Sequence, residues 1–207
     1  DLARIGVASG FEGLVCCSGI PGTVGGAIAG NAGAFGEQIG DVVESLCVAD
    51  RSGLLRTVPA SELGFAYRRS NLPQQGVVVV SARLRLRVGD RADLAARRTD
   101  ILALRAEKHP DWRVTPTAGS FFKNIEPTSK AARRQAAGWF LEQAGALAMR
   151  VGGAHPFERH ANIIVADPGC RAADVLALSQ QMVEAARARF HLELEREVRL
   201  IGFPARA

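Results

Sequence analysis

Four stretches of the sequence carry residue types that could bind a ligand or transfer a proton. The first is rich in glycine, since residues 10–40 hold ten of the 22 glycines in the chain. Glycine lets the backbone approach a ligand closely and adopt a positive φ, which exposes N–H groups to an anion. The spacing is neither that of a dinucleotide-binding turn nor that of a P-loop. We therefore expect a loop around Asn31 that contacts a cofactor phosphate or ring, with tight structural turns as the alternative.

The second stretch, residues 65–70, holds the only tyrosine of the chain, Tyr67, followed by Arg68 and Arg69. A planar guanidinium group can bind a carboxylate through two parallel hydrogen bonds, so this stretch could hold an acidic substrate. The alternative is a solvated arginine pair in a turn before Pro73.

The third and fourth stretches supply a hydroxyl group and carboxylates. Ser120 follows Gly119 and precedes two phenylalanines, where a hydroxyl could be desolvated and oriented. No histidine or acid stands at the spacing of a nucleophile elbow, which argues against acyl-enzyme chemistry. Strand alternation would place Glu193, Glu195 and Glu197 on one face, and such a face is usually solvated.

Composition limits the class of protein. The chain has 207 residues, of which 47% are apolar and 23% charged, as in one large or two small globular domains. The net charge of +5 comes without a basic run and with 6% aromatic residues, which favours a small anionic substrate over nucleic acid. The four cysteines show no C-x-x-C spacing and the four histidines no metal pattern. We therefore expect a reducing cytoplasm, no metal site and no membrane segment.

The hydrophobic pattern predicts two α+β units with a boundary near residue 92. Strands are predicted over 42–49, 54–58 and 77–88, the last with Arg83, Arg85 and Arg87 on its solvated face. Helices are predicted over 92–107, 136–144 and 172–190, with strands over 162–166 and 192–201.

Taken in order, these motifs resemble the UDP-N-acetylenolpyruvoylglucosamine reductase (MurB) family. The matching runs lie at 19–26, 31–36, 67–70, 118–124, 137–145 and 194–202. The resemblance implies an α+β fold with the second lobe of a two-lobed FAD-binding domain (PCMH or vanillyl-alcohol-oxidase-like) over 1–91. A smaller α+β substrate-binding domain would then occupy 92–207. It also implies that the first lobe is missing from this chain, which starts at Asp1, and that the extra tyrosine loop of some members is absent.

Members of this family use FAD to carry hydride from NADPH to the enolpyruvyl group of a UDP-sugar, giving UDP-N-acetylmuramate for peptidoglycan. The resemblance implies that Ser120 is the general acid that protonates C2 of the substrate, while Arg68 and Glu197 hold and polarise its carboxylate. Hydride addition builds enolate-like negative charge, which a nearby arginine would stabilise. A serine hydroxyl can act as an acid there only in a desolvated and oriented site.

The resemblance implies further binding roles. Flavin-contacting positions match Ile20, Gly22, Gly26 and Gly33, and positions facing the substrate or the nicotinamide nucleotide match Tyr67, Arg105, Lys108, Asn124 and His160. The expected partners are UDP-N-acetylglucosamine enolpyruvate and NADPH, with neither nucleic acid nor a membrane, and the expected state is a monomer. Two alternatives stay open: a non-catalytic UDP-sugar-binding remnant that no longer holds FAD, and an unrelated flavin oxidase of the same broad fold.

Overall fold

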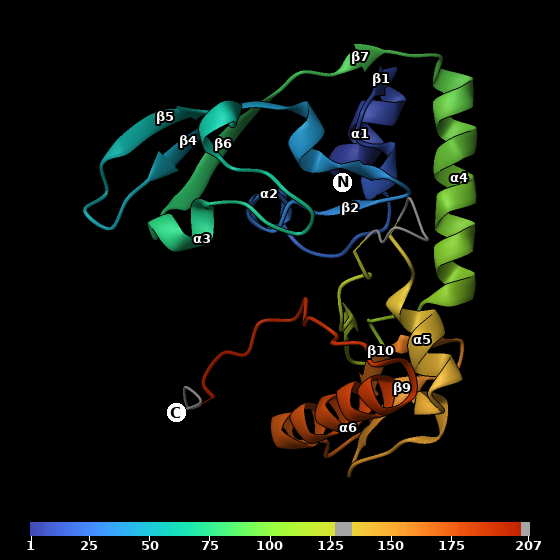
Figure 1. The fold of residues 1–207 in the computed structure, drawn as a ribbon. Coiled ribbons are helices and arrows are strands. Elements are labelled where there is room, and N and C mark those ends of the chain that lie inside the picture. The colour runs from blue at the N-terminus through green and yellow to red at the C-terminus, as the bar shows by residue number, and fades with distance from the viewer. Residues whose placement is uncertain (127–133, 204–207) are drawn as a thin grey trace. The chain divides into compact units, whose positions relative to one another are not determined.

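The computed structural model of the protein describes residues 1–126 and 134–203. It divides into two units, Asp1–Arg105 and Ala106–Ala207, and we describe each by itself (Figure 1). The division falls near the end of helix α4 (Arg91–Lys108), whereas the sequence pattern places a boundary at its start. The physical reason is Leu94, which is buried and packs in the first unit against Val7 and Val15.

The first unit combines short helices with antiparallel strands. Its α-helices are α1 (Leu2–Ala8), α2 (Val24–Ala29), α3 (Leu72–Gln75) and most of α4, and its 3-10 helices are η1 (Val15–Cys17), η2 (Ile39–Val42) and η3 (Ala60–Glu62). Its strands are β1 (Phe11–Glu12), β2 (Gly33–Ala34), β3 (Glu37–Gln38), β4 (Val43–Ala49), β5 (Leu55–Pro59), β6 (Val78–Leu84) and β7 (Arg87–Val88).

A three-stranded sheet in the order β5-β4-β6 forms the main layer of this unit (Figure 1). Strand β4 is central because it is apolar and pairs on both sides, with Leu46 opposite Val58 of β5 and Ala82 of β6. Leu46 and Val48 are fully buried on one face of β4, as period-two alternation requires. The strands predicted over 42–49 and 54–58 are therefore confirmed.

The strand predicted over 77–88 is interrupted. Strand β6 ends at Leu84, and β7 pairs instead with β1, where Val88 lies opposite Phe11. The sequence alternation is continuous, but the chain changes partner after Arg85, whose backbone N–H donates to Val42 O at 2.8 Å. The arginine face is solvated as expected, and Arg85 forms an exposed ion pair with Glu44.

The second unit is a three-stranded antiparallel sheet packed against helices. Its elements are β8 (Thr117–Ser120), α5 (Ala137–Gln143), the 3-10 helix η4 (Ala146–Ala148), β9 (Ala154–Phe157), β10 (His160–Ala166) and α6 (Ala172–Phe190), with sheet order β8-β10-β9. Helix α6 presents Leu178, Met182 and Ala186 to the core at a spacing of one helical turn. All three residues are fully buried, which confirms the helix predicted over 172–190.

The strand predicted over 192–201 is wrong. This segment forms a single bridge between Phe122 and Arg196, flanked by hydrogen bonds from Lys123 N to Glu195 O and from Glu197 N to Phe121 O. The alternating pattern supplies apolar residues that pack, but within residues 1–126 and 134–203 the only backbone it pairs with is the short stretch 121–123. The ladder therefore stops after one bridge.

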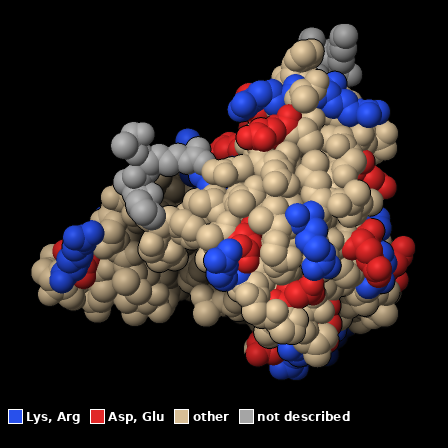
Figure 2. All heavy atoms as spheres, turned by 90° about the horizontal axis from the view of Figure 1, so that it is seen from below, with Lys and Arg blue, Asp and Glu red and all other residues tan. Residues whose placement is uncertain are grey.

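The surface carries mixed charge. On the face shown in Figure 2, the described Lys and Arg side chains are interspersed with Asp and Glu and do not gather into one basic patch. Across residues 1–126 and 134–203, no helix is both long enough and apolar enough to cross a membrane.

Candidate functional site

The residues predicted to form the site fall into two groups, one in each unit. The first unit holds Ile20, Gly22, Gly26, Gly33, Tyr67, Arg68 and Arg105, and the second holds Lys108, Ser120, Asn124, His160 and Glu197.

The glycine-rich segment is open at one end. Gly22 is exposed with φ at +118°, and a Cβ added there would meet no atom within 4 Å. The neighbouring Ile20 is half-buried, and a backbone hydrogen bond from its N–H to Cys17 O (3.2 Å) orients the loop. The loop at residues 20–22 can therefore receive a ligand close to the backbone.

Gly26 and Gly33, two of the glycines predicted to bind a cofactor, make close contacts within the protein. Thr23 caps helix α2 by accepting a hydrogen bond from Gly26 N at 3.1 Å, so this N–H group is already engaged. Gly33 is buried in the β2–β3 hairpin, where an added Cβ would lie 2.8 Å from the Cα of Gln38. Gly33 is thus required for close strand packing, and the N–H group of Gly26 is used in the helix cap.

Tyr67 and Arg68 form the tip of a tight turn. Ala66 and Arg69 exchange two backbone hydrogen bonds of 3.0 Å across it, and Arg68 adopts the left-handed conformation with φ at +54°. The guanidinium carbon of Arg68 lies 5.0 Å from the centre of the Tyr67 ring, within the range of a cation–π contact. The turn holds both side chains in a defined arrangement at a conformational cost of about 1–3 kcal/mol.

Asn31 ties this turn to the glycine-rich segment. Its amide nitrogen donates to Ala66 O at 2.8 Å, and its amide oxygen accepts from Gly40 N at 2.9 Å. Asn31 is fully buried and left-handed, with φ at +46°. Both ends of the amide are engaged inside the protein, so Asn31 positions the turn instead of contacting a cofactor phosphate.

Arg105, at the end of α4 within the first unit, lies against the same segment. Its guanidinium carbon is 6.0 Å from the Phe35 ring centre, and Gly19 leaves room for it, since a Cβ there would lie 2.9 Å from Arg105 Cδ. Burial lowers the pKa of Arg105, and the charge of Arg68 adds to this. Two guanidinium groups near each other favour binding of an anion.

In the second unit, Asn162 clamps the segment that follows Ser120. Its amide oxygen accepts from Phe122 N at 2.9 Å, its amide nitrogen donates to Phe122 O at 2.8 Å, and its carbonyl accepts from Phe121 N at 2.8 Å. Asn162 is buried, whereas Ser120 is half-buried beside the open space around Gly119. Among the described residues, none forms a hydrogen bond with Ser120 Oγ. Sequence reasoning missed Asn162, although a lone amide in the apolar run 161–165 was an available signal.

The backbone of Glu197 lies directly beside this segment. Its N–H donates to Phe121 O at 2.9 Å, so a half-buried carboxylate residue is adjacent to the serine strand. Lys123 and Glu195 pair at 2.5 Å one bridge away and hold the two segments together. Glu193 pairs instead with Arg187 of α6.

Lys108 and His160 lie near each other in the second unit. Burial lowers the pKa of His160, and the positive charge of Lys108 lowers it further. The imidazole lies 5.8 Å from the His109 ring and against α5, where Gly138 leaves space, since a Cβ there would be 3.0 Å from His160 Cε1. His160 is therefore neutral near pH 7, and Lys108 carries the positive charge of this pair.

Asn124 has a structural contact of its own. Its side-chain oxygen accepts a hydrogen bond from Ala137 N at 3.2 Å, at the first residue of α5. It thereby supplies an N-terminal cap that Ala136 cannot provide.

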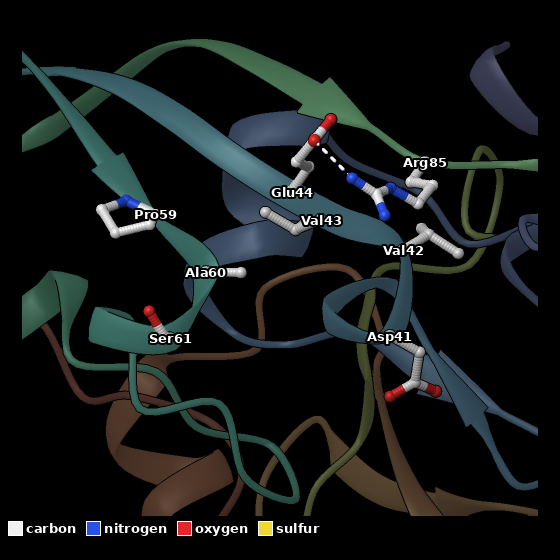
Figure 3. A pocket seen from close by; sticks show the side chains of 8 residues that line it. All are labelled: Asp41, Val42, Val43, Glu44, Pro59, Ala60, Ser61 and Arg85. Atoms are coloured by element: carbon white, nitrogen blue, oxygen red, sulfur yellow. Dashed lines mark hydrogen bonds and ion pairs between the residues drawn. The ribbon is translucent and has the colours of Figure 1, made fainter.

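The first unit also holds a cavity of about 350 Å³ whose lining includes none of the predicted site residues (Figure 3). It is lined by Asp41, Val42, Val43, Glu44, Pro59, Ala60, Ser61 and Arg85. Its charged groups are paired within the protein, because Glu44 binds Arg85 at 2.6 Å and Asp41 accepts from Gln38 N at 3.1 Å.

Comparison with known proteins first defines the class. The chain has the α+β fold of a solved reductase, the UDP-N-acetylenolpyruvylglucosamine reductase (MurB) from Thermus caldophilus. The TM-score is 0.78 at 31% identity, and the match covers 95% of this chain and 66% of that protein. Residues 109–201 match the family model described as UDP-N-acetylenolpyruvoylglucosamine reductase, C-terminal domain.

Curated relatives agree along the whole chain. The UDP-N-acetylenolpyruvoylglucosamine reductase of Heliobacterium modesticaldum is 42% identical over 97% of this chain, and that of Syntrophus aciditrophicus is 40% identical over 98%. The chain is thus similar over nearly its whole length to members of the UDP-N-acetylenolpyruvoylglucosamine reductase family. It spans 62% of the length of each of these two relatives.

Proposed function

We propose that the protein containing this chain is the FAD-dependent reductase that converts UDP-N-acetylglucosamine enolpyruvate to UDP-N-acetylmuramate with NADPH, in cytoplasmic peptidoglycan synthesis. The observation that carries the proposal is the pairing of Glu197 N with Phe121 O. It places the carboxylate residue beside the backbone segment that follows Ser120, although the two residues are far apart in sequence.

In this proposal Ser120 is the general acid. When bound, FAD supplies the hydride that reaches C3 of the enolpyruvyl group. The hydroxyl of Ser120 then delivers a proton to C2, where carbanion character develops. Two observations support this role: Ser120 is half-buried, and the Asn162 side chain holds the following segment through two hydrogen bonds to Phe122. A serine must be desolvated and oriented to donate a proton.

Arg68 and Glu197 act on the substrate carboxylate. Arg68 offers a planar pair of N–H donors and a fixed charge that stabilises the enolate-like dianion. Glu197 completes the polarisation from its half-buried position. Because two carboxylates repel each other, Glu197 is protonated or bridged by a cation when the substrate is bound.

The loop at Ile20–Gly22 fits a flat cofactor. The space beside Gly22 is open, and within the described residues the buried Ser18 Oγ has no hydrogen-bond partner. Ile20, Gly22, Gly26 and Gly33 would contact FAD, in part through their backbone. Residues 1–91 would be the second lobe of the flavin domain and residues 92–207 the substrate domain.

The remaining polar residues bind the nucleotide parts of the substrates. Tyr67 and Asn124 contact the UDP-sugar, and Arg105 and Lys108 bind diphosphate or nicotinamide nucleotide. The neutral His160 supplies a polar contact on the substrate side. The low pKa of His160 and the desolvated guanidinium of Arg105 support an anion-binding role for their surroundings. We propose a monomer, with neither nucleic acid nor a membrane as a partner.

The test uses the full-length protein from which this chain comes. We expect NADPH oxidation that depends on the enolpyruvyl substrate, with UDP-N-acetylmuramate as the product by mass spectrometry. Arg68→Lys keeps the charge but loses the planar pair of N–H donors, so kcat/KM should fall by about 10²–10³. Binding of the UDP-sugar without turnover would instead support a non-catalytic remnant, and NADPH oxidation by O₂ alone would support a flavin oxidase.

A further inference from the structure

Two adjacent thiols lie at the C-terminal end of η1, immediately before the glycine-rich loop. The sulfur atoms of Cys16 and Cys17 are 3.7 Å apart, and both cysteines are free thiols. Cys16 is buried with 2% of its surface exposed, whereas Cys17 is partly exposed. The proposed reductase reaction uses neither of them.

The charges of three side chains from three different elements act on the Cys17 thiol. These side chains are Arg105 from α4, Arg68 from the tight turn and Glu37 from β3. The hydrogen bond from Cys16 lowers the pKa of the Cys17 thiol most, and the two guanidinium groups lower it further, against burial and the Glu37 carboxylate. The same hydrogen bond, together with burial, raises the pKa of Cys16.

This arrangement separates the roles of the two thiols. The buried Cys16 is the weaker acid of the pair, because its pKa is raised, and the partly exposed Cys17 is the sulfur that ionises more readily, because its pKa is lowered. Thiolates, not thiols, are the nucleophiles of cysteine chemistry, and a positively charged, partly exposed environment is the setting in which they react. The two arginines can also bind a carboxylate next to the sulfur.

We propose that Cys17 is a modification site that reacts selectively with small disulfides carrying carboxylate groups. The Cys17 thiolate attacks one sulfur of the disulfide and forms a new S–S bond to it, while the original S–S bond breaks and the other half leaves as a thiolate. Cys17 is oxidised and the leaving half is reduced, so electrons balance without another oxidant. Arg105 and Arg68 bind the carboxylate of the half that stays attached. The mixed disulfide forms at Cys17 and not at Cys16, which is buried.

The experiment uses the 207-residue chain carrying Cys47→Ser and Cys170→Ser, so that only the adjacent pair can react. The probes are dithiobis(nitrobenzoate), which is a dianion, and dithiodipyridine, which is neutral. We expect Cys17 labelling by peptide mass mapping, with a rate whose pH midpoint lies below the ordinary thiol pKa of about 8.5. The labelling rate with the dianion, divided by the rate with the neutral probe, should be at least about tenfold higher at Cys17 than for a small free thiol. In about 1 M salt this difference should disappear.

Variants separate the two contributions. Arg105→Met should slow the dianionic probe and leave the neutral probe within about twofold, whereas Arg105→Lys should restore part of the selectivity. Cys16→Ala should raise the pH midpoint with both probes, and a far-ultraviolet spectrum like that of the parent shows that each variant is folded. Labelling of Cys16, equal reactivity of the two probes, or no labelling of the folded chain would overturn the proposal.

Discussion

Asn31 and Asn162 each use a buried amide to hold a neighbouring backbone segment that carries a candidate site residue. Asn31 holds the turn with Tyr67 and Arg68, and Asn162 holds the segment after Ser120. A buried amide with both ends satisfied restricts its neighbours, and removing it leaves buried backbone groups without partners. The positions of Arg68 in the first unit and of Ser120 in the second therefore depend on buried residues that would not touch the substrate.

Replacing Asn31 tests this dependence. Asn31→Ala removes both hydrogen bonds and places alanine at φ +46°, so the free energy of unfolding should fall by about 3–5 kcal/mol. Asn31→Gly removes the same bonds without the left-handed strain and should lose about 1–2 kcal/mol less. Urea unfolding measures both, and equal losses would show that backbone strain contributes nothing at this position.

The low pKa of His160 predicts how stability depends on pH. The folded pKa lies below the ordinary 6.5, so the unfolded chain takes up a proton on this imidazole at higher pH than the folded chain does. The contribution of His160 to the free energy of unfolding is complete above the ordinary pKa of 6.5, and it is lost as the pH falls from there through the lower pKa of the folded state. His160→Gln should therefore lose less stability than the parent between pH 7.5 and about 5.5 in urea unfolding. Parallel pH profiles would contradict this account.

Helices and strands differ in how far the sequence determines them. Helix α6 matches its predicted range because its apolar residues recur at the helical period and need no specific partner to define it. The predicted strand at 192–201 fails because alternation does not reveal which backbone will lie alongside. Asn162 escaped prediction for the same reason, since its hydrogen-bonding partners come from a segment 40 residues away.

The core of the second unit gives a prediction with an internal probe. Leu178 on α6 is fully buried, so Leu178→Ala should lower the free energy of unfolding by about 3–5 kcal/mol. Both tryptophans of the chain, Trp112 and Trp139, belong to this unit, so their fluorescence reports its unfolding in urea. The control is Leu147→Ala, where 40% exposure limits the expected loss to about 1 kcal/mol. A loss as large for Leu147 as for Leu178 would contradict this assignment of the core.

For the chain as a whole, the order of motifs predicts the family resemblance and predicts that Ser120 and Glu197 act in one site. The structure pairs Glu197 N with the carbonyl oxygen of Phe121, the residue that follows Ser120. Local reasoning could not foresee that Gly33 packs inside a hairpin or that Gly26 donates to a helix cap, because these contacts arise only in the folded unit.

The proposed contact of Lys108 with an anionic substrate predicts that binding depends on salt. In the full-length protein, raising the ionic strength from about 0.05 to 0.5 M should weaken UDP-sugar binding severalfold, because screening shortens the range of attraction. Lys108→Gln should weaken binding and flatten this dependence, while Lys123→Gln, whose charge is paired with Glu195, should leave the slope closer to that of the parent. Titration calorimetry at several salt concentrations measures both slopes, and binding insensitive to salt would argue against an electrostatic role for Lys108.

The assignment of Ser120 as proton donor is tested most directly by separating the two half-reactions of the full-length protein in a stopped-flow experiment. Ser120→Ala should leave reduction of the bound flavin by NADPH within about twofold of the parent, because no proton is delivered to the enolpyruvyl group in that half. Reoxidation by the enolpyruvyl substrate should slow by about 10²–10⁴-fold, the range expected for loss of a general acid. Ser81→Ala, on the exposed side of β6, serves as the matched control and should change neither half. Reoxidation of the Ser120→Ala protein at the parental rate would contradict the account.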